Sequence, residues 1–172
     1  PWYQWPVIWW PMWYFSGSAY LPDGMISSIS CMGNPAVWWT GLAALIFMIG
    51  QSAAHLGKIA YQKSCGEAAE RISRTRAFIL VGFAAQYLPW VLVPRSTFIY
   101  HYFASVPFII LATAQGLRYL ERRNRALSHA LTAVLVVAAV ALFIAFYPYA
   151  SGLEVSREWL ARMNWFKDWM WY

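Results

Sequence analysis

One arginine and a Tyr-His-Tyr cluster lie close together in this sequence, where one long apolar run ends and the next begins. Arg95 ends the first run, and Tyr100, His101 and Tyr102 open the second. A guanidinium can hold a phosphate through two parallel hydrogen bonds, and the start of a helix at the cluster adds a favourable field for an anion. These residues predict a phosphate site at a membrane surface. The alternatives are an interfacial anchor for Arg95 and a hydrogen-bonded structural role for His101.

A fifth candidate, Asn34, stands in the motif Gly33-Asn34-Pro35 before the first apolar run. Asn is a good helix N-cap and Pro is tolerated at the first helical position, which by itself explains both residues. Because a helix N-terminus also attracts anions, the alternative is that Asn34 belongs to the same phosphate site. Trp38 and Trp39, one turn later, are expected to be interfacial belt residues.

Membrane helices must position these candidates. The chain has 172 residues, of which 60% are hydrophobic and 12% charged, whereas a soluble domain carries about 25% charged residues. Its charge-free runs are long enough to cross a bilayer, which takes about 17 to 25 residues. The sequence therefore predicts an all-α integral membrane fold with Trp-rich interfacial segments at both ends. The four transmembrane helices are expected at about 35–57, 77–93, 98–117 and 127–147.

The predicted organisation has three parts. Residues 1–33 form an extracytoplasmic aromatic interfacial segment and loop, with an exposed loop over 16–30. Residues 34–150 form the four-helix domain, and residues 151–172 form an extracytoplasmic amphipathic tail. Pro89 and Pro107 should bend the second and third helices, and Pro148 should stop the fourth.

The net charge of +6 reflects membrane topology and does not indicate a nucleic-acid partner. Nine of the thirteen Lys and Arg residues fall in the two segments after the first and third spans, so the positive-inside rule makes both segments cytoplasmic. Both ends of the chain and the Arg95 hairpin are then extracytoplasmic. Cys31 and Cys65 lie on opposite sides and cannot pair. No His, Cys and acid cluster has metal-ligand spacing.

Three motifs carry a resemblance. Arg95-Ser-Thr-Phe-Ile-Tyr-His-Tyr-Phe103 follows Cys31-Met-Gly-Asn-Pro-Ala-Val-Trp-Trp39 and precedes Trp165-Phe-Lys-Asp-Trp169. In this order they resemble the C-terminal membrane region of the protein O-mannosyltransferase family. The resemblance implies transfer of mannose from a polyprenyl-phosphate carrier to Ser or Thr hydroxyls of an acceptor protein, with no cofactor. It also strengthens the interpretation of Arg95, Tyr100, His101, Tyr102 and Asn34 as a donor-phosphate site.

The resemblance places the general base in an early extracytoplasmic loop, upstream of these residues, and Asp23 is not assigned that role. We therefore expect the chain to be inactive by itself as part of a longer multi-pass protein of a bacterial plasma membrane. The rings of residues 1–15 either anchor the chain at the interface or line the access path of the lipid-linked donor. Two alternative functions remain: a lipid-phosphate-sugar glycosyltransferase with a lipid acceptor, and a non-catalytic scaffold or lipid-binding subunit.

Overall fold

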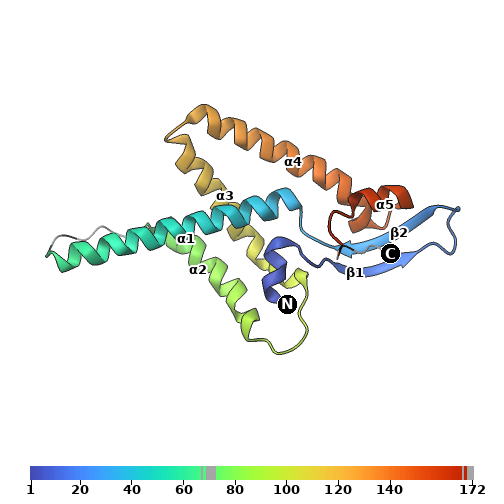
Figure 1. Cartoon of the computed structure of the whole chain (residues 1–172), viewed down its shortest axis with the longest axis horizontal. Coiled ribbons are helices and arrows are strands. Elements are labelled where there is room, and N and C mark those ends of the chain that lie inside the picture. The colour runs from blue at the N-terminus through green and yellow to red at the C-terminus, as the bar shows by residue number, and fades with distance from the viewer. Residues whose placement is uncertain (67, 69–72, 168, 170–172) are drawn as a thin grey trace.

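The computed structural model describes residues 1–66, 68, 73–167 and 169. Its main elements are four long helices, drawn in Figure 1. Two short 3-10 helices, η2 (Leu88–Leu92) and η3 (Ile99–Ser105), adjoin the second and third of them. With these extensions, four helical segments in the described part of the chain are long and apolar enough to cross a membrane, which confirms the predicted number. The four helices are α1 (Pro35–Ser64), α2 (Arg74–Tyr87), α3 (Val106–Glu121) and α4 (Arg125–Ser151).

The prolines act differently from one another. Pro89 coincides with the change from α2 to the tighter η2, and Pro107 stands in the first turn of α3, directly after η3. The prediction that Pro148 stops the fourth helix is wrong, because α4 continues through it to Ser151. Gly152 ends the helix instead. Its φ of 73° is a left-handed conformation that glycine adopts without a steric cost, and its N–H donates to the Pro148 carbonyl at 3.1 Å.

A small antiparallel sheet, with strand order β1-β2-β3, covers one end of the helices. Its strands are β1 (Met12–Gly17), β2 (Met25–Cys31) and β3 (Glu154–Ser156). The prediction of an exposed loop over 16–30 is therefore wrong. In β2 the buried side chains alternate at Ile26, Ser28 and Ser30. Two of these three inward positions hold serine, so the hydrophobic alternation that marks a strand is missing from the sequence.

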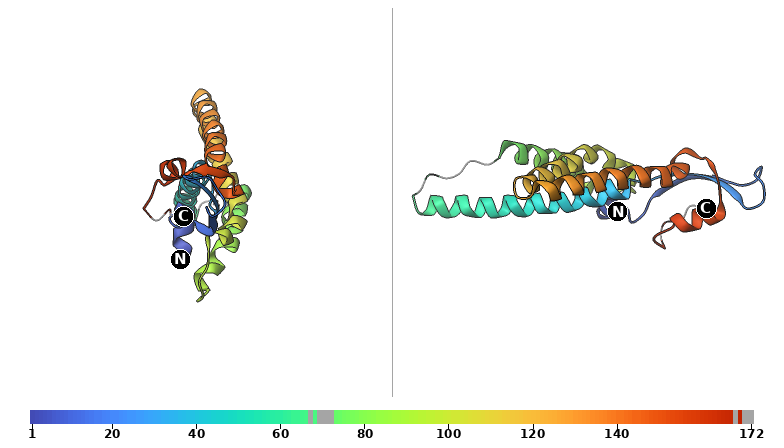
Figure 2. Two further views of the ribbon diagram at one scale, coloured as in Figure 1. Left: turned by 90° about the vertical axis from the view of Figure 1, so that its right-hand side faces the viewer. Right: turned by 90° about the horizontal axis from the view of Figure 1, so that it is seen from above.

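The larger of two hydrophobic clusters among the described residues lies where this sheet and the carboxyl tail meet the helices. The tail contributes the short helix α5 (Arg157–Met163) and the buried residues Leu160 and Trp169. They join one hydrophobic cluster with Trp5 of the amino-terminal segment, Tyr102 of η3 and Phe146 of α4. In the right view of Figure 2 the amino terminus and α5 lie towards the end that carries the β1–β2 hairpin, and the carboxyl end of α1 lies at the opposite end.

Candidate functional site

An open hollow of about 930 Å³ lies between the amino-terminal segment and the connection from η2 to η3. Arg95 is the charged side chain of its lining, and Ser96 and Thr97 stand next to it. On the facing wall, the 3-10 helix η1 (Trp2–Val7) and the segment from Trp10 to Trp13 supply indole rings and one amide. These residues are Trp2, Gln4, Trp5, Trp10 and Trp13.

Three aromatic donors from separate elements fix the amino-terminal wall. The Tyr87 hydroxyl of α2 donates to the Trp2 carbonyl at 3.0 Å. Two indoles do the same further along: Trp39 Nε1 of α1 donates to the Val7 carbonyl at 3.1 Å, and Trp169 Nε1 of the tail donates to the Ile8 carbonyl at 2.7 Å. The wall is thus attached to α1, α2 and the tail, and its position relative to Arg95 depends on all three.

His101 has a positioning role in this geometry. Its ring stacks on Trp5, with centroids 5.9 Å apart and planes 21° apart, and lies 4.1 Å from the Trp90 ring. Its Nδ1 lies 3.1 Å from the Phe98 nitrogen and 2.9 Å from the Phe98 carbonyl oxygen. His101 therefore holds Trp5, a wall of the hollow, against the start of η3, and the ring itself does not line the hollow.

The two tyrosines of the cluster point to different environments. Tyr102 is fully buried, and its ring packs against those of Trp38, Phe83 and Tyr87. Tyr100 is 40% exposed and packs on Phe98 and His101. Neither residue lines the hollow that contains Arg95.

Asn34 caps a helix and joins two helices. Its Oδ1 accepts hydrogen bonds from the Ala36 and Val37 nitrogens at 3.0 and 3.4 Å, as an N-cap does. Its Nδ2 donates to the Ala139 carbonyl of α4 at 2.8 Å. Both ends of the amide thus hold the start of α1 against α4. The neighbouring Trp38 was expected in an interfacial belt; that prediction is wrong, because Trp38 is only 6% exposed, inside the core.

Of the five predicted site residues, Arg95 lines the hollow, and His101 reaches it through Trp5. Sequence reasoning missed Gln4, Ser96 and Thr97 as lining residues. The adjacency of two hydroxyl side chains to the arginine was the available signal, since a guanidinium and hydroxyls together suit phosphate oxygens. Four indole rings of residues 1–15 line the hollow, and that they form an access path for a lipid-linked donor stays a prediction.

The chemistry available in this lining is binding by hydrogen-bond donors and by aromatic faces. Arg95, Ser96 and Thr97 can donate to an anionic oxygen, and the indole rings offer apolar faces. Among the described residues that line it there is no carboxylate, and Asp23 stands in the turn between β1 and β2, outside it. In the described part of the chain, no three His, Cys, Asp or Glu residues are grouped to hold a metal ion. The described lining thus offers donors that suit an anion, and it includes no carboxylate that could act as a general base.

Comparison with known proteins gives the chain a family. The sequence profile of the C-terminal four-transmembrane region of protein O-mannosyltransferase matches residues 1–169. The chain belongs to the protein O-mannosyltransferase family. The family resemblance of the sequence and the predicted helical membrane fold with four spans are thereby confirmed.

Curated relatives in this family are mannosyltransferases. Dolichyl-phosphate-mannose–protein mannosyltransferase 5 of Candida albicans is 31% identical over 52% of this chain and 12% of its own length. Dolichyl-phosphate-mannose–protein mannosyltransferase 1 of Saccharomyces cerevisiae is 27% identical over 83% and 18%. Polyprenol-phosphate-mannose–protein mannosyltransferase of Corynebacterium glutamicum is 27% identical over 98% and 31%. The chain thus spans less than a third of the length of each.

A solved structure shares the fold of this protein O-mannosyltransferase region. It is that of the S. cerevisiae protein O-mannosyltransferase Pmt1-Pmt2 complex bound to the sugar donor. The match has a TM-score of 0.74 at 24% identity and covers 99% of this chain and 23% of the other. The arrangement of helices, hairpin and tail in Figure 1 is therefore one that the family also has in a solved member.

Proposed function

We propose that this chain is the part of a protein O-mannosyltransferase that binds the phosphate of a polyprenyl-phosphate-mannose donor, while the complete protein transfers mannose to Ser or Thr hydroxyls of an acceptor protein. The observation that carries the proposal is Arg95 in a hollow next to two hydroxyl side chains. The names of the curated relatives support the donor and the type of acceptor.

In this mechanism the Arg95 guanidinium holds two phosphate oxygens, and the Ser96 and Thr97 hydroxyls donate to the same group. Negative charge grows on the phosphate as the bond from the sugar to its oxygen breaks, so these donors bind the departing group more strongly than the intact donor. A general base must take the proton from the acceptor hydroxyl. Since the described residues that line the hollow include no carboxylate, we assign the base to a part of the protein outside residues 1–172, and expect these residues alone to transfer no mannose.

The orientation is part of the proposal. Lys58 and Lys63 lie at the carboxyl end of α1, and Arg118 and Arg125 lie on either side of the turn from α3 to α4. We place these basic ends in the cytoplasm of a bacterium, by the positive-inside rule. The hollow, the sheet and both chain ends then face the extracytoplasmic side.

The test is mannose transfer by the full-length enzyme with Arg95→Lys, at matched abundance in membranes supplied with the donor and a Ser/Thr peptide. Lysine keeps the charge but cannot form the planar two-bond contact. We expect the rate to fall by roughly 30- to 1000-fold, which corresponds to about 2 to 4 kcal/mol of lost transition-state stabilisation.

The control is Arg157→Lys. Arg157 is an exposed residue of α5, and its Nη2 lies 3.5 Å from the Ser18 hydroxyl oxygen. It lies outside the hollow, so this variant should keep the parental rate. Activity of the Arg95→Lys enzyme within about twofold of the parent would remove Arg95 from the donor site, because a lysine anchors a chain at the interface as well as an arginine does.

A further inference from the structure

A second cavity, separate from the Arg95 hollow, is an apolar groove of about 570 Å³ between α1, α3 and α4. Along α1 it extends from Ala36 to Phe47, a length of about 16 Å at the rise of an α-helix. This is roughly half of a hydrocarbon core about 30 Å thick. The groove therefore has about the depth of a single leaflet.

One end of the groove carries a cation. The Arg123 guanidinium carbon lies 4.8 Å above the centre of the Tyr119 ring, and that ring meets Phe47 edge to face at 5.5 Å. All three residues line the groove. The Arg123 guanidinium thus packs on Tyr119, one of two aromatic side chains that adjoin the apolar part of the groove.

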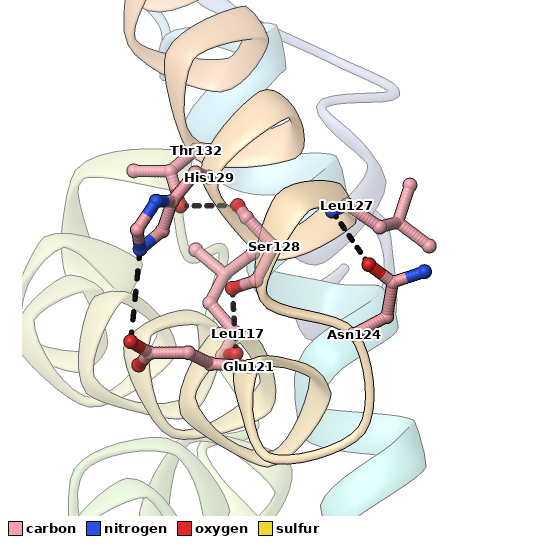
Figure 3. Close-up of polar contacts among 7 residues, drawn as sticks. All are labelled: Leu117, Glu121, Asn124, Leu127, Ser128, His129 and Thr132. Carbon is pink, nitrogen blue, oxygen red and sulfur yellow. Dashed lines mark hydrogen bonds and ion pairs between the residues drawn. The ribbon is translucent and has the colours of Figure 1, made fainter.

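The turn that carries Arg123 is fixed by hydrogen bonds. The Arg123 nitrogen donates to the Leu120 carbonyl at 2.9 Å. In Figure 3, the Leu127 nitrogen donates to Asn124 Oδ1 at 3.0 Å, and the Ser128 hydroxyl of α4 donates to the Leu117 carbonyl of α3 at 2.9 Å.

Glu121, the acidic residue near this turn, is close to His129 and not to Arg123. Figure 3 also shows Glu121 Oε1 3.6 Å from His129 Nε2. Among the described residues no carboxylate lies within ion-pair distance of Arg123, so its charge is available to a ligand.

The size and charge of the groove identify its occupant. A helix with its side chains is about 10 to 12 Å wide, so 570 Å³ would hold only about 5 to 7 Å of its length. A flexible hydrocarbon chain is much thinner. Arg118 and Arg122 stand near the same turn and would concentrate anionic headgroups there.

We propose that this groove binds one acyl chain of an anionic phospholipid, with the lipid phosphate on the Arg123 guanidinium. The site lies at the turn from α3 to α4, whereas Arg95 stands in the connection between η2 and η3. It therefore does not depend on the donor-phosphate role of Arg95.

The experiment uses the full-length protein in vesicles containing equal amounts of phosphatidylglycerol and phosphatidylcholine, with a small amount of polyprenyl phosphate. After mild detergent extraction, the retained lipids are measured by mass spectrometry. The parent protein should retain phosphatidylglycerol preferentially, and Arg123→Ala should reduce that preference about tenfold, as expected for loss of a charge-assisted contact. Arg125→Ala removes an arginine of the same turn that does not line the groove, and it should retain the preference.

A second pair of variants leaves every charge in place. Ala43→Phe puts a ring into the groove and should abolish preferential retention, whereas Val137→Phe adds the same ring at an α4 position that is 67% exposed and outside the groove. Three results would overturn the proposal. These are equal losses in the two arginine variants, retention of polyprenyl phosphate in place of phosphatidylglycerol, and a photo-crosslink from position 43 to another segment of the protein.

Discussion

The two ends of the helical bundle are built in different ways. At the end with the hollow, the sheet and the tail, large side chains such as Tyr102 and Trp169 are fully buried. Towards the opposite end, Leu56 and Tyr61 of α1 expose 52% and 68% of their surfaces. The first end is fixed by contacts within this chain. At the second end, the chain leaves apolar helix surface for the membrane or for other parts of the protein.

Glycines show the same contrast. A Cβ on Gly41 would lie 2.8 Å from the Ile109 side chain, and one on Gly82 would lie 2.1 Å from the Phe108 ring. A Cβ on Gly50 or Gly57 would meet nothing within 4 Å. Glycine is thus a packing requirement near the core, where helix backbones and neighbouring side chains approach closely. In the later turns of α1 it has no such role.

The strongest test of this contrast is Trp169→Ala. This change removes a fully buried indole and the 2.7 Å hydrogen bond to the Ile8 carbonyl, so the free energy of unfolding should fall by about 3 to 5 kcal/mol. Tyr61→Ala, at an exposed position of α1, should change it by only about 0.5 kcal/mol. Unfolding in mixed detergent micelles measures both. Similar losses would mean that the ends do not differ in stability.

Gly82→Ala should have the next largest effect. The added methyl group would overlap the Phe108 ring, so α2 and α3 must separate or the ring must move, at a cost of about 1 to 3 kcal/mol. Phe108→Leu in the same protein should restore part of the lost stability, because the flexible leucine removes the ring. If the double variant is no more stable than Gly82→Ala alone, the contact with Phe108 is not the cause.

The four helices and the position of Arg95 between two of them could be predicted from the sequence, because charge-free length and an isolated cation are local signals. The positions of the other candidate residues relative to the hollow could not be predicted. Tyr100, His101 and Tyr102 follow one another in a 3-10 helix, where consecutive residues point about 120° apart. One therefore packs at the surface, one against the wall of the hollow and one in the core. Which of these directions faces the hollow depends on residues 1–13, almost a hundred positions away.

Gly57→Ala should raise the stability of the protein, whereas Trp169→Ala and Gly82→Ala should lower it. The position is in the interior of α1, and the new methyl group has open space. Alanine should raise the free energy of unfolding by about 0.5 to 1 kcal/mol, because glycine loses more backbone freedom on folding. The same micelle assay measures it. A loss of stability would show that the later part of α1 is packed more closely than its surface indicates.

The smallest effect concerns the two cysteines, which lie at the two different ends. Burial raises the pKa of the Cys31 thiol, although a hydrogen bond with Tyr14 offsets part of the increase. Because the thiolate is the reactive form, Cys31 should react with a maleimide a few-fold more slowly than the exposed Cys65 in detergent at pH 8. Raising the pH should narrow the difference. A difference that does not change with pH would point to limited access alone.

The amino-terminal hairpin can complete its contacts only late in synthesis, because its partners, β3 and the tail, are made after α4. Val155 pairs with Ile26 in the sheet, and Trp169 donates to the Ile8 carbonyl across 161 positions. A ribosome makes the amino-terminal segment first, but its partners emerge only after α4. The hairpin must therefore wait, with one edge of β2 unpaired, until all four helices have been inserted. Residues translated after α4 close the hollow's end of the fold, so a chain shortened before β3 would keep its membrane helices but leave that end unfinished.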